Sequence, residues 1–210
     1  MKKVKIYLMC LGLFMGTSGV FAQSIGVNLG LNLSSMTIED DDFDYCEDCS
    51  MRLGYHLGGN ISFAMSDNMN LEIGLLFNTK GTKAEAGSIT SKTNLGYLDV
   101  PILAKYNFGS DDMGIMAIGG LSLGYGIMGK YKLDFDGNEE ESDVVWGSDD
   151  DSDFKALDYG VIVGAGLMID KLQITLTYNL GLANISPYED DSYNVNNNVI
   201  RLGVSYRLTD

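Results

Sequence analysis

The segment LQITLTYNL, from Leu172 to Leu180, alternates between apolar and polar side chains. Its even-numbered positions are leucine, isoleucine or tyrosine, and its odd-numbered positions are glutamine, threonine or asparagine. Successive side chains of an extended strand point to opposite faces, so this period of two predicts a β-strand with one apolar and one polar face. The preceding pair, Asp170 and Lys171, predicts a two-residue hairpin to the strand before it.

The same alternation recurs about eight times along the chain. We therefore expect strands at residues 24–36, 51–65, 70–80, 91–108, 113–133, 154–169, 172–184 and 196–208. The connections after the second, fourth and sixth strands are short, and the others are longer. This asymmetry is typical of membrane barrels, whose strands need roughly 9–11 tilted residues to span the bilayer. The pattern predicts an all-β, eight-stranded antiparallel up-and-down transmembrane β-barrel.

A soluble β-sandwich is the alternative, because its inner faces are also apolar. Two features favour the membrane barrel. The polar set is rich in Gly, Ser, Asn and Thr but poor in Lys and Glu, whereas a face in water usually carries more charge. Aromatic side chains also gather near strand ends on the apolar face, where barrels carry aromatic girdles: Phe63, Phe77, Tyr106, Tyr125, Tyr159 and Tyr206.

The first residues have the composition of a secretory signal peptide. Lysines at the start precede an apolar run at residues 6–14, and small residues follow up to Ala22. We expect residues 1–22 to be cleaved, which leaves residues 23–210 as one outer-membrane β-barrel domain.

The expected mature chain is strongly acidic, with 11 basic and 29 acidic residues. This balance argues against nucleic acid as a partner. Three loops hold 20 of the 29 acids, and clustered carboxylates can bind Ca²⁺ or Mg²⁺ weakly and bridge to lipopolysaccharide phosphates. The weak candidate ligands are Asp134, Asp136, Asp149 and Asp151. The favoured interpretation is a solvated, repulsive loop surface without bound cations, with weak cation binding as its alternative, and no other cofactor is expected.

Six charged residues fall on the inner face by the same alternation: Glu72, Asp99, Lys105, Asp158, Arg201 and Arg207. Side chains just fill the interior of an eight-stranded barrel. An unpaired buried charge is costly, so we expect these groups to form a salt-bridge network that plugs the lumen. A gate or a path for small ions is the alternative interpretation.

Cys46 and Cys49 form a CxxC motif in the first acidic loop. A zinc site needs four ligands, whereas no other cysteine survives cleavage and His56 is the only histidine. In an oxidising, exported location the motif predicts a disulfide instead.

A lipid-modifying active site would need a nucleophile, a base and an orienting acid. His56 shares its expected face with Asn60 and Ser62, and Glu72 on the next strand could supply the acid. No motif supports this arrangement, so we expect no catalytic residue and no enzymatic activity.

The segment LGYLDVPILAKYNFG, from Leu95 to Gly109, resembles a segment common in the PorT-like outer-membrane β-barrel family of Bacteroidota. The segments IGVNLGLNLSSM and RLGVSYRL, near the two ends of the expected mature chain, are also similar to that family. The resemblance implies an eight-stranded barrel in the bacterial outer membrane, and one family member is tied to a protein-secretion system.

Together these observations predict a non-enzymatic, monomeric outer-membrane barrel in contact with lipid and lipopolysaccharide. Its expected role is structural or in surface interaction. The alternatives are an accessory role in an envelope secretion complex and, less favoured, a lipid-modifying barrel enzyme.

Overall fold

The computed structural model describes residues 23–39, 49–87, 89–109, 113–135, 138–149, 151–188 and 193–209. It contains β1 (Gln23–Glu39), β2 (Cys49–Ser66), β3 (Met69–Ala86), β4 (Ile89–Asn107), β5 (Met113–Phe135), β6 (Asn138–Asp143), β7 (Leu157–Ile169), β8 (Leu172–Gly181) and β9 (Asn194–Arg207). These residues include no helix that is long and apolar enough to cross a membrane.

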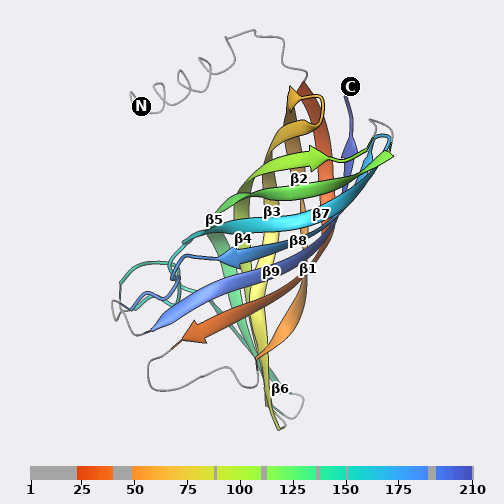
Figure 1. Cartoon of the computed structure of the whole chain (residues 1–210). Coiled ribbons are helices and arrows are strands. Elements are labelled where there is room, and N and C mark those ends of the chain that lie inside the picture. The colour runs from red at the N-terminus through yellow and green to blue at the C-terminus, as the bar shows by residue number, and fades with distance from the viewer. Residues whose placement is uncertain are drawn as a thin grey trace.

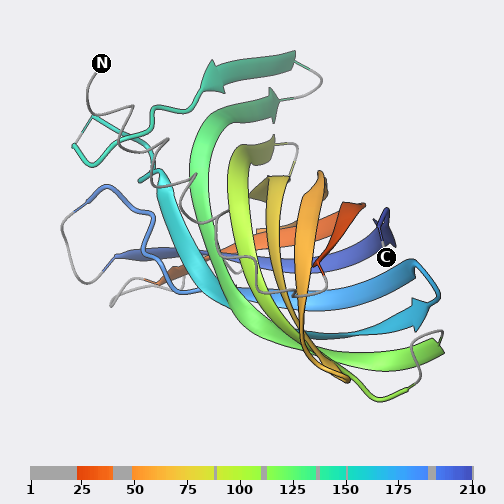
Figure 2. The same cartoon turned by 90° about the horizontal axis from the view of Figure 1, so that it is seen from above.

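Eight of the strands close into a ring of antiparallel pairs, in the order β1, β2, β3, β4, β5, β7, β8, β9 and back to β1 (Figures 1 and 2). The sixth strand, β6, extends the sheet beyond one mouth and pairs with β5 (Figure 1). The predicted all-β, eight-stranded antiparallel up-and-down barrel is confirmed.

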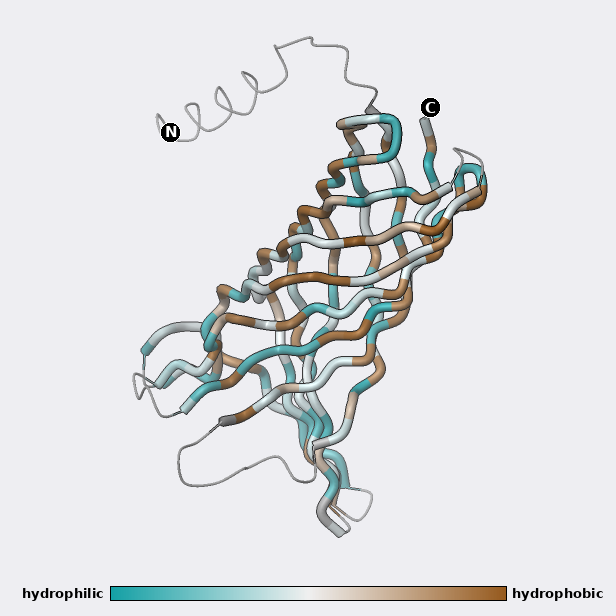
Figure 3. The backbone as a smooth tube through the Cα atoms, in the orientation of Figure 1, coloured by the Kyte–Doolittle hydropathy of each residue, from teal (hydrophilic) through white to brown (hydrophobic). Residues whose placement is uncertain are grey.

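The two faces of the barrel wall have opposite character. In β1, Leu29 and Leu31 are each 53% exposed, whereas Asn32 is fully buried. Figure 3 shows this as hydrophobic and hydrophilic segments that alternate along the strands. Apolar side chains circle the outside, at Leu57, Leu75, Leu121, Val163, Leu176 and Leu202. This arrangement inverts that of a soluble domain and leaves a continuous apolar belt for lipid.

The connection between β3 and β4 is shorter than predicted. Residues 81–90 were expected to form a loop, but β3 runs to Ala86 and β4 begins at Ile89. Gly81 allows the ladder to continue, because its φ of 135° is rare for other residues. A Cβ there would also lie only 2.0 Å from the carbonyl oxygen of Thr93.

The region predicted as a long acidic loop, residues 134–153, is also more ordered than expected. It includes β6, and Val144 and Trp146 turn back over the mouth of the barrel farthest from the short turns. An apolar cluster closes this mouth: Met36, Leu95, Tyr97, Val144, Ala183, Ile185 and Val195 are buried, and Trp146, Phe154, Tyr131 and Tyr193 pack against them. We call this cluster the apolar cap.

The opposite half of the lumen also departs from the expected lining of small polar residues. Leu103, Met116, Ile118, Ile162 and Met168 form a second buried apolar cluster there. The interior therefore contains buried apolar side chains as well as buried polar ones.

Candidate functional site

A buried network of charges crosses the lumen beneath the apolar cap. Asp99 on β4 is fully buried, and its carboxylate lies 3.1 Å from Arg201 Nη2 of β9 and 3.2 Å from Lys80 Nζ of β3. Lys80 Nζ also lies 2.9 Å from the carboxylate of Asp158 on β7. Asn78 donates a further hydrogen bond to Asp99. Four strands are therefore tied together across the interior.

A second, smaller group lies nearer the short turns. Lys105 Nζ lies 2.6 Å from Glu72 Oε2 and donates to Gln173 Oε1 at 2.9 Å. Ser62 Oγ donates to the same Glu72 oxygen at 3.2 Å. Both charged side chains are almost completely buried. The pair contains one acid and one base, so it is neutral overall, as is the network around Asp99.

Three buried acids thus face three buried bases inside the described barrel: Glu72, Asp99 and Asp158 against Lys80, Lys105 and Arg201. Removing one member of a buried pair is expensive, because the remaining charge loses its compensation. The balance therefore makes the interior a set of mutually dependent side chains.

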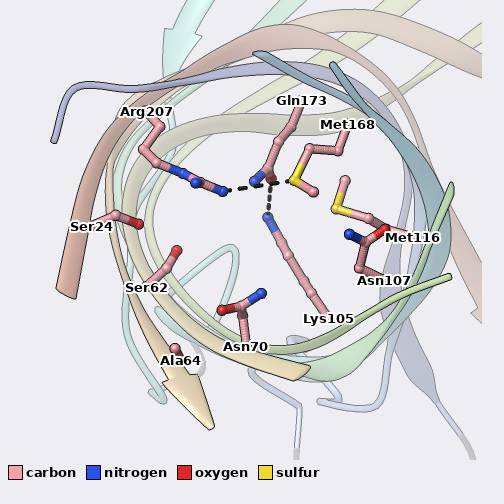
Figure 4. Close-up of a pocket in the computed structure, with 10 residues that line it drawn as sticks. All are labelled: Ser24, Ser62, Ala64, Asn70, Lys105, Asn107, Met116, Met168, Gln173 and Arg207. Carbon is pink, nitrogen blue, oxygen red and sulfur yellow. Dashed lines mark hydrogen bonds between the residues drawn. The ribbon is translucent and has the colours of Figure 1, made fainter. Parts of the chain in front are cut away.

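Arg207, the sixth charged residue predicted for the inner face, lies apart from this network. It is half-buried at the end of β9, and its Nη2 lies 3.7 Å from Met168 Sδ. It lines a cavity at the turn end of the lumen, together with Lys105 and Gln173 (Figure 4).

Lys80 is the member of the network that the sequence prediction omitted. The parity that places Glu72 on the inner face of the third strand also places Lys80 there, at the last residue of the predicted strand, residues 70–80. Its Nζ lies 4.4 Å from the centroid of the Tyr97 ring, a cation–π contact that joins the network to the apolar cap. Tyr97 itself is fully buried.

The residues considered for an enzymatic site lie near one another, since His56, Asn60 and Glu72 line one small cavity, but their hydrogen bonds are separate. His56 contacts the Asn32 amide through Nδ1 at 2.7 Å and the Asn28 amide through Nε2 at 3.0 Å. Ser62 is bonded to Glu72 instead, and no hydrogen bond in the described ranges joins His56 to Ser62. The histidine is held by amides, as a packed structural residue is.

The described part of the chain contains no group of three or more His, Cys, Asp or Glu side chains placed to hold a metal ion. Asp134, Asp149 and Asp151 belong to that part, whereas Asp136 lies outside it. Cys46 and the side chain of Cys49 also lie outside the described residues, as does the predicted signal peptide, residues 1–22. The cation, disulfide and signal-peptide predictions stay predictions.

Several solved membrane proteins are similar to this chain. Ail, the attachment invasion locus protein of Yersinia pestis, is 15% identical with a TM-score of 0.42, over 88% of this chain and 98% of that one. OprG of Pseudomonas aeruginosa is 12% identical with a TM-score of 0.49, over 90% and 98%. Neisserial surface protein A is 12% identical with a TM-score of 0.44, over 89% and 99%.

A comparison with curated proteins found no match. The model of one protein family, described as the outer membrane protein beta-barrel domain, matches residues 21–186, which is most of the chain. The match agrees with the closed eight-stranded ring and its apolar outer belt. The chain therefore belongs to the outer membrane protein beta-barrel domain family, whose location is the bacterial outer membrane.

Proposed function

We propose that this protein is a non-conducting, non-enzymatic barrel with a structural or surface-interaction role. It acts through its extracellular end, which is the mouth closed by the apolar cap. The observation that carries the proposal is the closed lumen. The ion pairs of Asp99, Arg201 and Lys80 cross the interior, and the apolar cap lies over them. A permeating ion would have to break buried pairs and cross an apolar layer, both of which are costly.

The shape of the extracellular end supports the same proposal. β4 has 19 residues and β5 has 23, about twice the roughly 9–11 that a membrane strand needs. The excess forms a sheet that projects beyond the barrel mouth together with β6 (Figure 1). Much of the sequence is thus devoted to a surface outside the membrane, with the acidic segments around it.

Conductance in planar lipid bilayers tests the proposal. The chain without residues 1–22, refolded in detergent and inserted into the bilayer, should give no regular current steps, whereas a 16-stranded porin in the same membrane should conduct. The Asp99→Ala/Arg201→Ala variant, which removes a buried ion pair and the volume of both side chains from the plug, should leak more than the wild type. Regular single-channel steps from the wild-type protein would rule out a closed lumen.

A second candidate is an accessory role in an envelope protein-secretion complex. The similarity of the segment Leu95–Gly109 to the PorT-like barrels of Bacteroidota favours it. The two candidates differ in their partners: the first requires lipid and lipopolysaccharide around a monomer, and the second requires envelope proteins in fixed proportion. Affinity purification from native membranes distinguishes them, because a stoichiometric envelope partner would favour the secretion role.

A further inference from the structure

The turn end of the lumen contains a cavity of about 120 Å³ (Figure 4). This is room for several water molecules, since a single one needs at least about 10–15 Å³ of such space. Lys105, Met116 and Met168 are buried at its floor, while Ser24, Asn70 and Arg207 are only half-buried. The cavity is thus deep on one side and reached from the periplasmic end.

The cavity carries an uncompensated positive charge among the described residues. Lys105 is paired with Glu72, so its charge is already matched. Arg207, in contrast, donates one side-chain hydrogen bond in the described ranges, to the weak acceptor Met168 Sδ at 3.7 Å. Its planar guanidinium therefore retains most of its five donors, and Figure 4 shows it pointing over the cavity toward Gln173.

The neutral side chains around Arg207 are oriented as donors. Gln173 Oε1 accepts the hydrogen bond from Lys105, which leaves the amide nitrogen of the same side chain on the side of the cavity. Asn70 and Ser24 also line the cavity and can each donate another hydrogen bond. Several donors and one unmatched cation therefore converge on a space that admits a few heavy atoms.

We propose that this cavity is a binding site for a small oxyanion of the phosphate type, with Arg207 as its principal ligand. A guanidinium matches the geometry of phosphate oxygens and can bind two of them at once. The phosphate could be free in the periplasm or be the headgroup of a lipid in the inner leaflet. This site is at the opposite end from the surface proposed above and does not depend on that function.

Titration of the refolded chain in a neutral detergent with sodium phosphate, at constant ionic strength, tests the site. Binding should saturate at one phosphate per chain and shift the side-chain ¹⁵N–¹H resonances of Arg207 and Gln173. Arg207→Gln should weaken binding at least tenfold, which corresponds to about 1.4 kcal/mol. Arg207→Lys retains the charge but loses the planar guanidinium, so its phosphate affinity should lie between those of the wild type and Arg207→Gln.

Lys171→Gln is the matched control, because Lys171 lies in the turn at the same end of the barrel and does not line the cavity. It removes one positive charge, as Arg207→Gln does, and should change phosphate affinity less than twofold. Equal weakening by both variants would show only a general charge effect and would overturn the proposal.

Dihexanoyl phosphatidic acid, compared with inorganic phosphate, distinguishes the two sources. Tighter binding of the lipid, lost in Arg207→Gln, assigns the site to a lipid headgroup, and binding no tighter than that of phosphate assigns it to the free anion. Failure of the wild-type resonances of Arg207 and Gln173 to shift with either ligand would overturn the proposal without reference to any variant.

Discussion

Asp99 is the residue on which most of the buried network depends, since it faces both Arg201 and Lys80 with no exposed surface. Asp99→Asn keeps the shape of the side chain but leaves the two cations with less compensation. Loss of one member of a buried ion pair costs about 3–5 kcal/mol, and we expect that loss in the free energy of unfolding. Urea unfolding in lipid vesicles measures it through the fluorescence of Trp146, the single tryptophan.

Lys83→Gln is the control for this measurement, because its ion pair with Glu85 lies in a partly exposed part of β3. Exposed pairs contribute about 0–1 kcal/mol. The Asp99→Asn/Arg201→Gln double variant should lose less stability than the sum of its single variants, since the two residues interact directly. Equal losses for Lys83→Gln and Asp99→Asn would contradict the structural role of the network.

The sequence could predict the face of each inner residue but not its partner. Alternation places Asp99 and Arg201 on the inner side of their strands, yet the two are 102 positions apart and meet across the lumen. Which side chains reach each other there depends on the tilt and stagger of the strands. The alternation of apolar and polar residues gives no information on either. Trp146 illustrates the same limit, since its place over Gly126 follows from no local pattern.

At the scale of elements, the pairing of β6 with β5 is expected to depend on pH. Glu141 of β6 forms ion pairs with Lys132 and Lys130 of β5. Hydrogen bonds from Lys132 and Lys130 lower the pKa of Glu141 below its ordinary value of 4.5, and the hydrogen bond to Glu141 raises the pKa of Lys132 above 10.5. The carboxylate's contribution is therefore complete above pH 4.5 and is lost as the pH falls through the lowered pKa. The lysine's contribution is complete below pH 10.5 and is lost as the pH rises through the raised pKa of Lys132.

Backbone NOEs between β5 and β6 report this pairing directly. In the wild type these NOEs should be strong at neutral pH and weaken in acid. In Glu141→Gln they should already be weak at neutral pH and change little on acidification. Glu140→Gln is the matched control, because this neighbouring glutamate is exposed, and within the described residues Lys130 and Lys132 of β5 pair with Glu141 instead. An identical response of the two variants would mean that net charge, and not the specific pairs, holds β6.

The extracellular elements were also the least predictable ones. The spacer at residues 134–153 has no alternation and many carboxylates, features that usually indicate a solvated loop. Its few apolar residues, among them Val144 and Trp146, are nevertheless the ones that pack into the apolar cap. Scattered apolar residues have no period, so their burial depends on tertiary contacts that pattern analysis does not see.

At the scale of the whole molecule, the architecture was predictable because one rule applies to the entire chain. Each strand has an apolar face, and turns join the strands in sequence, so the simplest closed arrangement is a ring in which β1 meets β9. Closure satisfies the backbone hydrogen bonds that an open sheet would expose to lipid. The position of the lumen plug and the apolar cap, by contrast, requires the three-dimensional register.

The same architecture predicts how the molecule behaves in detergent. Side chains such as Leu53, Leu75 and Leu121, each more than half exposed, form an apolar belt whose exposure to water is unfavourable. We expect the chain without residues 1–22 to aggregate in plain buffer and to fold in detergent. Because its backbone is paired all around the ring, the folded barrel should resist SDS at room temperature and migrate differently on a gel before and after boiling. A monodisperse, water-soluble fold in the absence of detergent and lipid would contradict the outward placement of the apolar faces, and the membrane location with it.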